Sequence, residues 1–396
     1  MSKRESNNTT GFQIRSLAIP VFVPSLLFST GEASLIPILP SAAQRLGADL
    51  PTAGFIAGLT VMGMVFFDIP SSRIVNRLGE RRAMILAAVI ASLCITGALF
   101  ATSIWMLGIS VFAAGSMASI FALARHAFLT EFVPFTHRAR SLSILGGMFR
   151  GGAFLGPMVG AGVVFAFGEH WVYTVGILFC LAAASVLLMV PAGSIQDTPT
   201  DTHSSPWRIF AQERGKLSTV GLTSTILAML RTVRQIGLPL WGLYIGMHPG
   251  TVSLFIGIAG ALDVALFYVS GQIMDRFGRR WAVVPCLVGM AVTHVALIFA
   301  HTPTWFLVVA IAMSLANATG SGVVLTLGAD MAPEGQRNEF LAAYRLLVDA
   351  GVAVTPVVLS SLTVAITLSG AIGVMAGISL VGAGMGWRYL PRFGIR

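Results

Sequence analysis

The sequence has little charge. Asp, Glu, Lys and Arg make up 10% of its 396 residues, whereas about 25% is usual in soluble globular domains. Hydrophobic residues make up 55% of the chain, and the mean hydropathy is +0.83. These proportions exclude a soluble fold and indicate a protein that crosses a lipid bilayer several times.

Cysteine is also scarce. Cys94, Cys180 and Cys286 lie in apolar runs at unrelated spacings, which argues against a disulfide framework and against a metal site. The sequence has no phosphate-binding loop, nucleophile constellation or metal cluster, so we expect no enzyme, metal or other cofactor. The net charge of +9 does not indicate nucleic-acid binding, because the basic residues lie in short loops between apolar runs.

Twelve apolar runs lie between charged or turn-forming breaks. Each is long enough to cross the roughly 30 Å of hydrocarbon as a helix, which takes about 20 residues. We therefore predict an all-α membrane protein with twelve transmembrane helices. The expected spans are 17–39, 53–75, 83–103, 106–128, 141–166, 171–192, 219–246, 252–273, 281–300, 305–328, 340–364 and 368–390.

The basic residues predict the orientation. Twelve spans place both termini on one side, and if that side is cytoplasmic, nineteen Lys and Arg lie inside and only Arg45 lies outside. This bias follows the positive-inside rule. We therefore expect a multi-pass protein of the plasma membrane, with both termini cytoplasmic. Its short loops fit a bacterial inner membrane.

The two halves of the chain repeat. A shift of 199 residues superposes Arg, Gly and Pro positions in five regions without a gap, among them Arg77 on Arg276 and Pro157 on Pro356. Duplication predicts two pseudo-symmetric six-helix bundles with a substrate site near the midplane between them. The expected parts are an N-terminal bundle over 1–192, a cytoplasmic linker over 193–218 and a C-terminal bundle over 219–396.

The fifth expected span carries small residues at helical spacing, Gly152, Gly156 and Gly160, with Pro157 beside them. Glycines four apart fall on one face and let a second helix approach closely. The pattern G-x-x-x-G-P-x-x-G also resembles the fifth-helix signature of antiporters of the major facilitator superfamily. On its own, the pattern is equally typical of ordinary helix packing.

Two loops strengthen this resemblance. The loop after the eighth span matches the superfamily motif G-x-x-x-D-R-x-G-R-R, whereas the loop after the second span is degenerate, with serine for the first glycine and asparagine for the aspartate. The matching residues are Gly271, Asp275, Arg276, Gly278 and Arg280 in the first case and Ser72, Asn76, Arg77, Gly79 and Arg81 in the second.

The resemblance implies the twelve-helix fold of this superfamily and transport by alternating access. In the family, the carboxylate of the loop motif helps to hold the two halves together in the outward-facing state. Asn76 brings no charge, so we expect a weaker latch in the first half. Asp68, near the end of the second span, is assigned to the same cytoplasmic gate.

Ionisable residues in the middle of a membrane span are costly and are functional candidates. The sequence has seven such residues: Glu32, Arg150, Arg231, Arg234, Asp263, Arg345 and Asp349. Gln235 lies beside Arg231 and Arg234 and is a further candidate. The helix neighbours implied by the resemblance suggest one ion pair per half, Glu32 with Arg150 and Arg231 with Asp349. An Arg150–Asp263 pair across the halves is the competing scheme.

These residues leave two kinds of transport open. Glu32, Asp263 and Asp349 are candidates for proton coupling, because a substrate that binds the adjacent arginine frees a carboxylate to take a proton. Together with the fifth-span signature, this favours proton-coupled efflux of small molecules of the multidrug type. Four arginines against three carboxylates favour instead an organic anion or zwitterion bound by Arg231 and Arg234.

A third interpretation is that the protein does not transport solutes but acts as a receptor or a lipid scramblase. For every reading that involves transport, the expected partners are a small-molecule substrate, protons and the lipid bilayer, and the protein is expected to act as a monomer.

Overall fold

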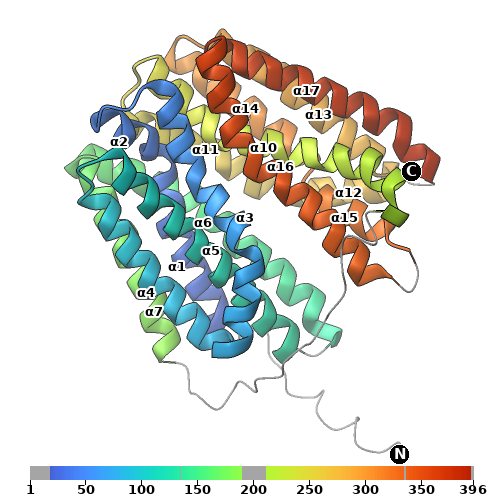
Figure 1. Ribbon diagram of the computed structural model, residues 1–396, viewed down its shortest axis with the longest axis horizontal. Helices are drawn as coiled ribbons and strands as arrows, with labels where there is room; N and C mark the ends of the chain where they lie inside the picture. Colours follow the sequence, from blue (N-terminus) through green and yellow to red (C-terminus); the bar gives the residue numbers. More distant parts are fainter. Residues whose placement is uncertain (1–17, 134, 190–210, 334–335, 394–396) are drawn as a thin grey trace, which may run out of the picture.

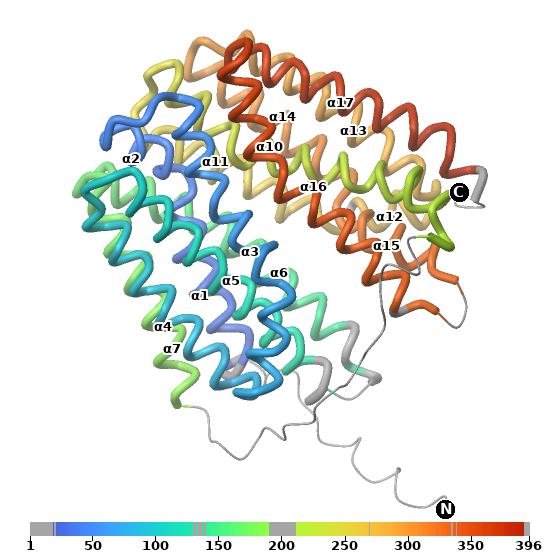
Figure 2. The backbone as a smooth tube through the Cα atoms, viewed as in Figure 1, coloured from blue at the N-terminus to red at the C-terminus, as the bar shows by residue number. Residues whose placement is uncertain are grey.

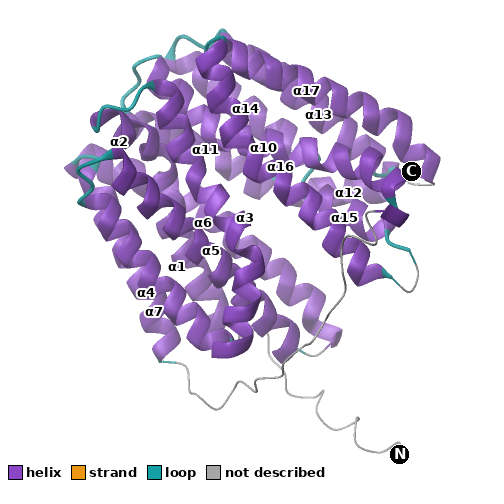
Figure 3. Cartoon of the chain, in the orientation of Figure 1, coloured by secondary structure: helices purple, strands orange, loops and turns teal. Residues whose placement is uncertain are grey.

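Every regular element in the described part of the chain is helical. The computed structural model describes residues 18–133, 135–189, 211–333 and 336–393, and within these ranges it contains no β-strand. Figure 3 shows helices throughout, with loops confined to short turns. The predicted all-α fold class is confirmed.

The first half contains seven α-helices in the described ranges, of which α2 is short, and short flanking turns. A π-helical turn and a 3-10 turn, Ala18–Phe22 and Ile36–Ile38, flank the first helix. The helices are α1 (Val23–Leu35), α2 (Leu39–Arg45), α3 (Leu50–Leu78), α4 (Glu80–Leu99), α5 (Ile104–Phe132), α6 (Phe135–Phe167) and α7 (His170–Leu188).

The second half repeats this order, but two of its expected spans are broken. Its helices are α9 (Arg214–Lys216), α10 (Leu222–Tyr244), α11 (Pro249–Ala265), α12 (Phe267–Phe277), α13 (Arg280–Ile298), α14 (Pro303–Thr319), α15 (Val323–Met331), α16 (Arg337–Ala365) and α17 (Leu368–Tyr389). The breaks lie between α11 and α12 and between α14 and α15.

Each of the twelve expected spans overlaps helical segments in the described residues, but the count of twelve is not confirmed, because fewer segments meet a strict standard of length and hydropathy. Ten helical stretches in the described ranges do so, or eleven if the bent pair α11–α12 is one span. Helix α10, which corresponds to the expected span 219–246, does not meet this standard. It carries Arg231, Arg234 and Gln235 in its middle, which lowers its hydropathy.

The helices form two groups that follow the sequence halves. Figure 1 shows α1 to α7 in one group and α10 to α17 in the other. Within the first group α3 packs on α5 and α1 on α6, and within the second α13 packs on α17 and α10 on α16. The predicted linker, residues 193–218, lies mostly outside the described residues, so the domain boundaries stay a prediction.

Two helix pairs make most of the contacts between the groups, α6 with α11 and α3 with α16. Along the first pair Phe165 stacks on His248, with ring centroids 5.6 Å apart. Arg150 lies farther along the same interface. The tube in Figure 2 shows the groups side by side near α2 and α11 and spreading apart toward α15 and the other end of α6. The two groups are therefore held together mainly toward one end.

The glycines of α6 let α1 approach closely, as expected. A Cβ on Gly152 would lie 2.9 Å from the backbone of Ser29, and one on Gly156 would lie 2.7 Å from the Cβ of Ala33. Gly160 faces the carbonyl of Ser34 in the same way. This close packing fixes which face of α6 is turned away from α1.

Candidate functional site

The most buried charged pair among those in the described residues joins α10 to α11. Arg234 Nη2 lies 2.5 Å from Asp263 Oδ2, and the two side chains are only 15% and 18% exposed. The same nitrogen donates to Ser314 Oγ at 2.8 Å, and Asn317 Nδ2 donates to Asp263 Oδ1 at 2.9 Å. These contacts join α10, α11 and α14 in one charged network. The several donors around Asp263 offset the cost of burying its carboxylate.

Arg231 extends this network without a carboxylate of its own. Its Nε donates to Asn317 Oδ1 at 2.9 Å and its Nη2 to the carbonyl of Gly320 at 2.6 Å. The predicted Arg231–Asp349 pair is wrong in this structure. Arg231 is turned toward the end of α14, where neutral acceptors receive its hydrogen bonds.

The break between α14 and α15 supplies those acceptors. Gly322 adopts φ +80°, a left-handed conformation that suits glycine, and α15 begins at the next residue. Ser270 Oγ is 2.9 Å from the Thr319 carbonyl and 2.7 Å from that of Ser321, which stabilises the open turn. The sequence analysis missed this break, although the run Thr-Gly-Ser-Gly was a signal for it.

Arg150 crosses from the first group of helices to the second. Its Nη1 donates to Ser321 Oγ at 2.9 Å, and its guanidinium lies 3.8 Å from the ring centre of Phe267. Arg150 therefore binds neutral groups at the helix break.

Neither of the pairings predicted for Arg150 is formed, because no carboxylate oxygen lies within 4 Å of it in the described part of the chain. On α6, position 150 is two residues, about 200°, around the helix from Gly152, which packs on α1. Arg150 therefore points away from Glu32. Asp263 already binds Arg234 and Asn317.

A second charged cluster joins α3 to α16. Arg345 Nη2 lies 3.2 Å from Asp68 Oδ2, and its Nε lies 3.3 Å from Asp349 Oδ2, one turn along its own helix. Ser119 donates to the other oxygen of Asp68 at 2.7 Å. The Arg345 side chain is 67% exposed. Asp68, assigned from the sequence to the gate, thus binds the opposite half directly.

Glu32 lies apart from both clusters. It lines a pocket inside the first group of helices, whose walls come from α1, α3, α4, α5 and α7. Arg125 is the charged group that acts on it electrostatically, but no Arg nitrogen of the described residues lies within 4 Å of its carboxylate. The rings of Phe28 and Phe121 stack at 4.1 Å between the turns that carry Glu32 and Arg125. Gln235 is exposed and joins neither cluster.

The two loop motifs form the tight turns expected of them. Gly79 and Gly278 have φ values of +76° and +92°, which favour glycine. Arg81 donates to the carbonyls of Leu187 and Leu188, at 3.0 and 3.1 Å, and so caps the C-terminal end of α7. This arginine therefore anchors one helix of its half to another.

In the second half the motif arginines bind differently. Arg280 lies 3.1 Å from the ring centre of Trp387, and Arg279 binds Asp330 at 2.9 Å. Asp275 is 85% exposed and lies 3.7 Å from Arg279, four residues later and just before α13. No contact in the described part of the structure places this carboxylate at a helix N-terminus.

The remaining motif residues have no partner across the halves in the described ranges. Exposed residues among them are Ser72, Asn76, Arg77 and Arg276, and Gly271 has open space where a Cβ would lie. The gate functions of these residues stay predictions. In the same ranges no three His, Cys, Asp or Glu side chains are arranged to hold a metal ion.

Comparison with known proteins agrees with the division into two halves. The family profile of the Major Facilitator Superfamily matches residues 21–232 and again residues 220–394. Two curated proteins are similar at low identity. The uncharacterized MFS-type transporter YhjO of Bacillus subtilis is 22% identical over 155 residues, which are 39% of this chain and 37% of that protein. The class H tetracycline resistance protein of Pasteurella multocida is 20% identical over 285 residues, 67% of this chain and 68% of that protein.

Solved structures resemble the fold along nearly its whole length. A POT family transporter in complex with a thioalcohol-conjugated peptide gives a TM-score of 0.80 at 12% identity, with 96% of both chains covered. A point mutant of the nucleoside transporter NupG gives 0.79 at 12% identity and covers 94% of this chain and 99% of its own. A D-xylose-proton symporter gives 0.71 at 15%, with 96% and 98% covered. At such identities the likeness concerns the fold alone.

Proposed function

The chain belongs to the Major Facilitator Superfamily, and on this premise we propose that it exports small molecules in exchange for protons by alternating access. Its family and fold make it a multi-pass membrane transporter and not an enzyme. In such a carrier two bundles move against each other around a site near the bilayer midplane.

The observation that carries the proposal is a pair of polar contacts between the halves. Arg150 donates to Ser321, and Arg345 binds Asp68. Arg345 also holds Asp349 on its own helix, so it can release Asp68 without leaving its guanidinium unpaired. Contacts of this kind can form and break as the bundles move, which is what alternating access requires.

The same clusters support a scheme for proton coupling. Asp263 and Asp349 are each held by an arginine, Arg234 and Arg345 respectively. A substrate that binds the arginine removes the counter-charge from the carboxylate. A partly buried carboxylate in that state is stabilised by taking a proton. Among the residues that the structure describes, Glu32 has no arginine at ion-pair distance, so this exchange does not extend to it.

Export is favoured by two resemblances. The fifth-span pattern resembles that of the superfamily's antiporters, and one relative at 20% identity is named as a tetracycline resistance protein. The positive-inside bias supports a plasma membrane location with cytoplasmic termini, as in a bacterial inner membrane. We propose a monomer, since each chain supplies both bundles.

One observation favours a second candidate, transport of an organic anion or zwitterion. Within the described part of the chain, Arg231 and Arg150 bind only neutral acceptors, and Asp263 is the one carboxylate that binds Arg234. A guanidinium without a carboxylate partner can bind a carboxylate or phosphate on a substrate through two hydrogen bonds.

Solute flux into proteoliposomes that contain the purified protein tests the two transport hypotheses. We expect vesicles with an acidic lumen to accumulate the lipophilic cation tetraphenylphosphonium, and a protonophore to abolish the accumulation. Asp263→Asn and Asp349→Asn should abolish it, while Asp275→Asn, which alters an exposed carboxylate on α12, should retain it.

Other outcomes contradict the export proposal in distinct ways. Uptake of an organic anion that is lost in Arg231→Ala and Arg234→Ala, with no cation uptake, would favour the second candidate. An absence of flux for both classes of solute, in protein that is folded and monodisperse, would favour a receptor or lipid scramblase.

A further inference from the structure

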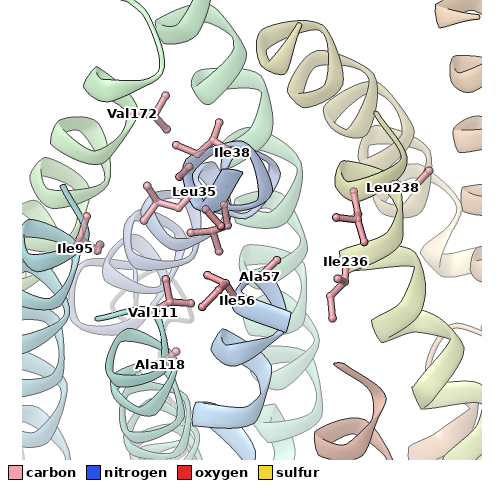
Figure 4. Packing of buried hydrophobic residues seen from close by; sticks show 14 of the residues in the cluster. Leu35, Ile38, Ile56, Ala57, Ile95, Val111, Ala118, Val172, Ile236 and Leu238 are labelled. Carbon is pink, nitrogen blue, oxygen red and sulfur yellow. The ribbon is translucent and has the colours of Figure 1, made fainter. Parts of the chain in front are cut away.

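The pocket around Glu32 is separate from the charged contacts between the halves. It lies among helices of the first half, whose side chains line it. Figure 4 shows Leu35 of α1, Ile95 of α4 and Val111 of α5, three of the residues that line it.

The repeat explains why the first half is hollow here. Three alanines line this pocket, and the residues 199 positions later are large and at most 1% exposed. The pairs are Ala91 and Met290, Ala98 and Leu297, and Ala114 and Met313. At these three positions the second half therefore has large buried side chains where the first half has alanine. Protein interiors are normally close-packed, so an opening kept at one of two equivalent places is a candidate ligand site.

The walls are mostly apolar and carry a single ionisable carboxyl group. Phe28 and Tyr173 contribute aromatic rings, and Cys94 and Cys180 contribute thiols. Glu32 supplies the carboxyl, with no Lys or Arg nitrogen within 4 Å in the described part of the chain. Arg125 acts on this carboxyl electrostatically but forms no ion pair with it within 4 Å. An ionised carboxylate in such surroundings is costly without a counter-charge in direct contact, and an organic ammonium group would provide one. Aromatic rings also attract organic cations.

We propose that this pocket binds a small, mainly apolar amine in its ammonium form, with Glu32 as the counter-charge. The rest of the ligand would contact the alanine-lined wall. This site is distinct from the proposed transport site and goes beyond the proposed function. A protein that carried no solute would still bind the amine, so the two proposals fail separately.

The native cysteines allow a direct test on the full chain in detergent. Cys94 lines the pocket and is half-buried, whereas Cys286 is buried in the second half and lines no part of it. Modification by methyl methanethiosulfonate is followed at each cysteine by mass spectrometry, at one fixed pH because the thiolate is the reactive form. The probe is 2-phenylethylamine, and 2-phenylethanol, similar in size but uncharged, is the control ligand.

We expect the amine to slow modification of Cys94 and to leave Cys286 unchanged. The slowing should be about tenfold at about ten times Kd, because only the free protein reacts. The alcohol should give little protection. Glu32→Gln should raise the Kd of the amine by about tenfold or more, and Ala114→Met, which introduces the residue of the second half, should abolish binding. If Ala114→Met does not fold, Ala91→Met makes the same test.

Three results would overturn the proposal. The first is that the amine does not protect Cys94 in the unmodified protein. The second is equal protection by the alcohol, which would mean that the ammonium group has no role. The third is full amine affinity in Glu32→Gln.

Discussion

The network around Arg234 and Asp263 should make a large contribution to stability. Both side chains are mostly buried, and Asp263 also accepts from Asn317. Asp263→Asn removes the negative charge with little change of shape and leaves the guanidinium of Arg234 buried with Ser314 as its remaining strong acceptor. Removing one partner of a fully buried pair costs about 3–5 kcal/mol. Because these side chains keep some exposure, we expect about 3 kcal/mol here.

The Arg345–Asp68 pair is a natural comparison within the same molecule. It has the same chemistry at 3.2 Å, but its side chains are 67% and 30% exposed. Exposed pairs contribute about 0–1 kcal/mol. We therefore expect a coupling energy of about 2 kcal/mol between Arg234 and Asp263 and less than about 1 kcal/mol between Arg345 and Asp68.

Two double-mutant cycles in detergent micelles measure these coupling energies. One uses Arg234→Gln and Asp263→Asn, and the other Arg345→Gln and Asp68→Asn, each with its double variant, and unfolding free energies come from denaturant titration. A charge swap of Arg234 and Asp263 should recover part of the loss. The reasoning from burial would be refuted if the exposed pair coupled as strongly as the buried one.

Two further predictions follow from packing and capping. Gly156→Val should lower the yield of monodisperse protein in size-exclusion chromatography, because a Cβ at this position would lie 2.7 Å from the Cβ of Ala33. The control is Gly162→Val, which should leave the yield unchanged, because a Cβ at that position has no neighbouring atom within 4 Å. At the start of α3, hydrogen bonds from the Thr52 side chain and backbone lower the pKa of Asp49. The stability from this cap is therefore present at neutral pH and lost as pH falls through the lowered pKa. Asp49→Ala should cost at most about 1 kcal/mol in unfolding at pH 7 and less below about pH 4, while Asp49→Asn should retain most of the cap.

The helices were predictable because a bilayer imposes one strong rule, that each crossing is an apolar helix with its backbone groups paired internally. The expected span 281–300 is observed as Arg280–Ile298, and 368–390 as Leu368–Tyr389. The turns at Gly79 and Gly278 were predictable for a related reason, since their backbone conformation favours glycine. The break at Gly322 was missed because hydropathy alone does not distinguish a continuous span from two half-helices.

The ion pairs were not predictable to the same degree. Depth along a helix can be counted from sequence, but the rotation of each helix depends on the packing of all its neighbours. On α6 that packing turns Arg150 away from α1. The neutral partners Ser314, Asn317 and Gly320 were also missed, because no charge marks them in the sequence.

The two halves have helices at equivalent positions, but equivalent residues form different side-chain contacts. Differences in side-chain size explain why the contacts differ. Glu32 and Arg231 are equivalent under the 199-residue shift, as are Phe121 and Gly320. In the second half Arg231 Nη2 donates to the Gly320 carbonyl at 2.6 Å, and a Cβ on Gly320 would lie 2.7 Å from Cys286 Sγ.

In the first half the equivalent place is filled by Phe121, stacked on Phe28 at 4.1 Å. In the described residues Glu32 forms no hydrogen bond to a donor and no ion pair within 4 Å, and it lines the pocket instead. The aromatic pair and the three alanines therefore determine together that one repeat contains an open pocket where the other contains a hydrogen-bonded arginine.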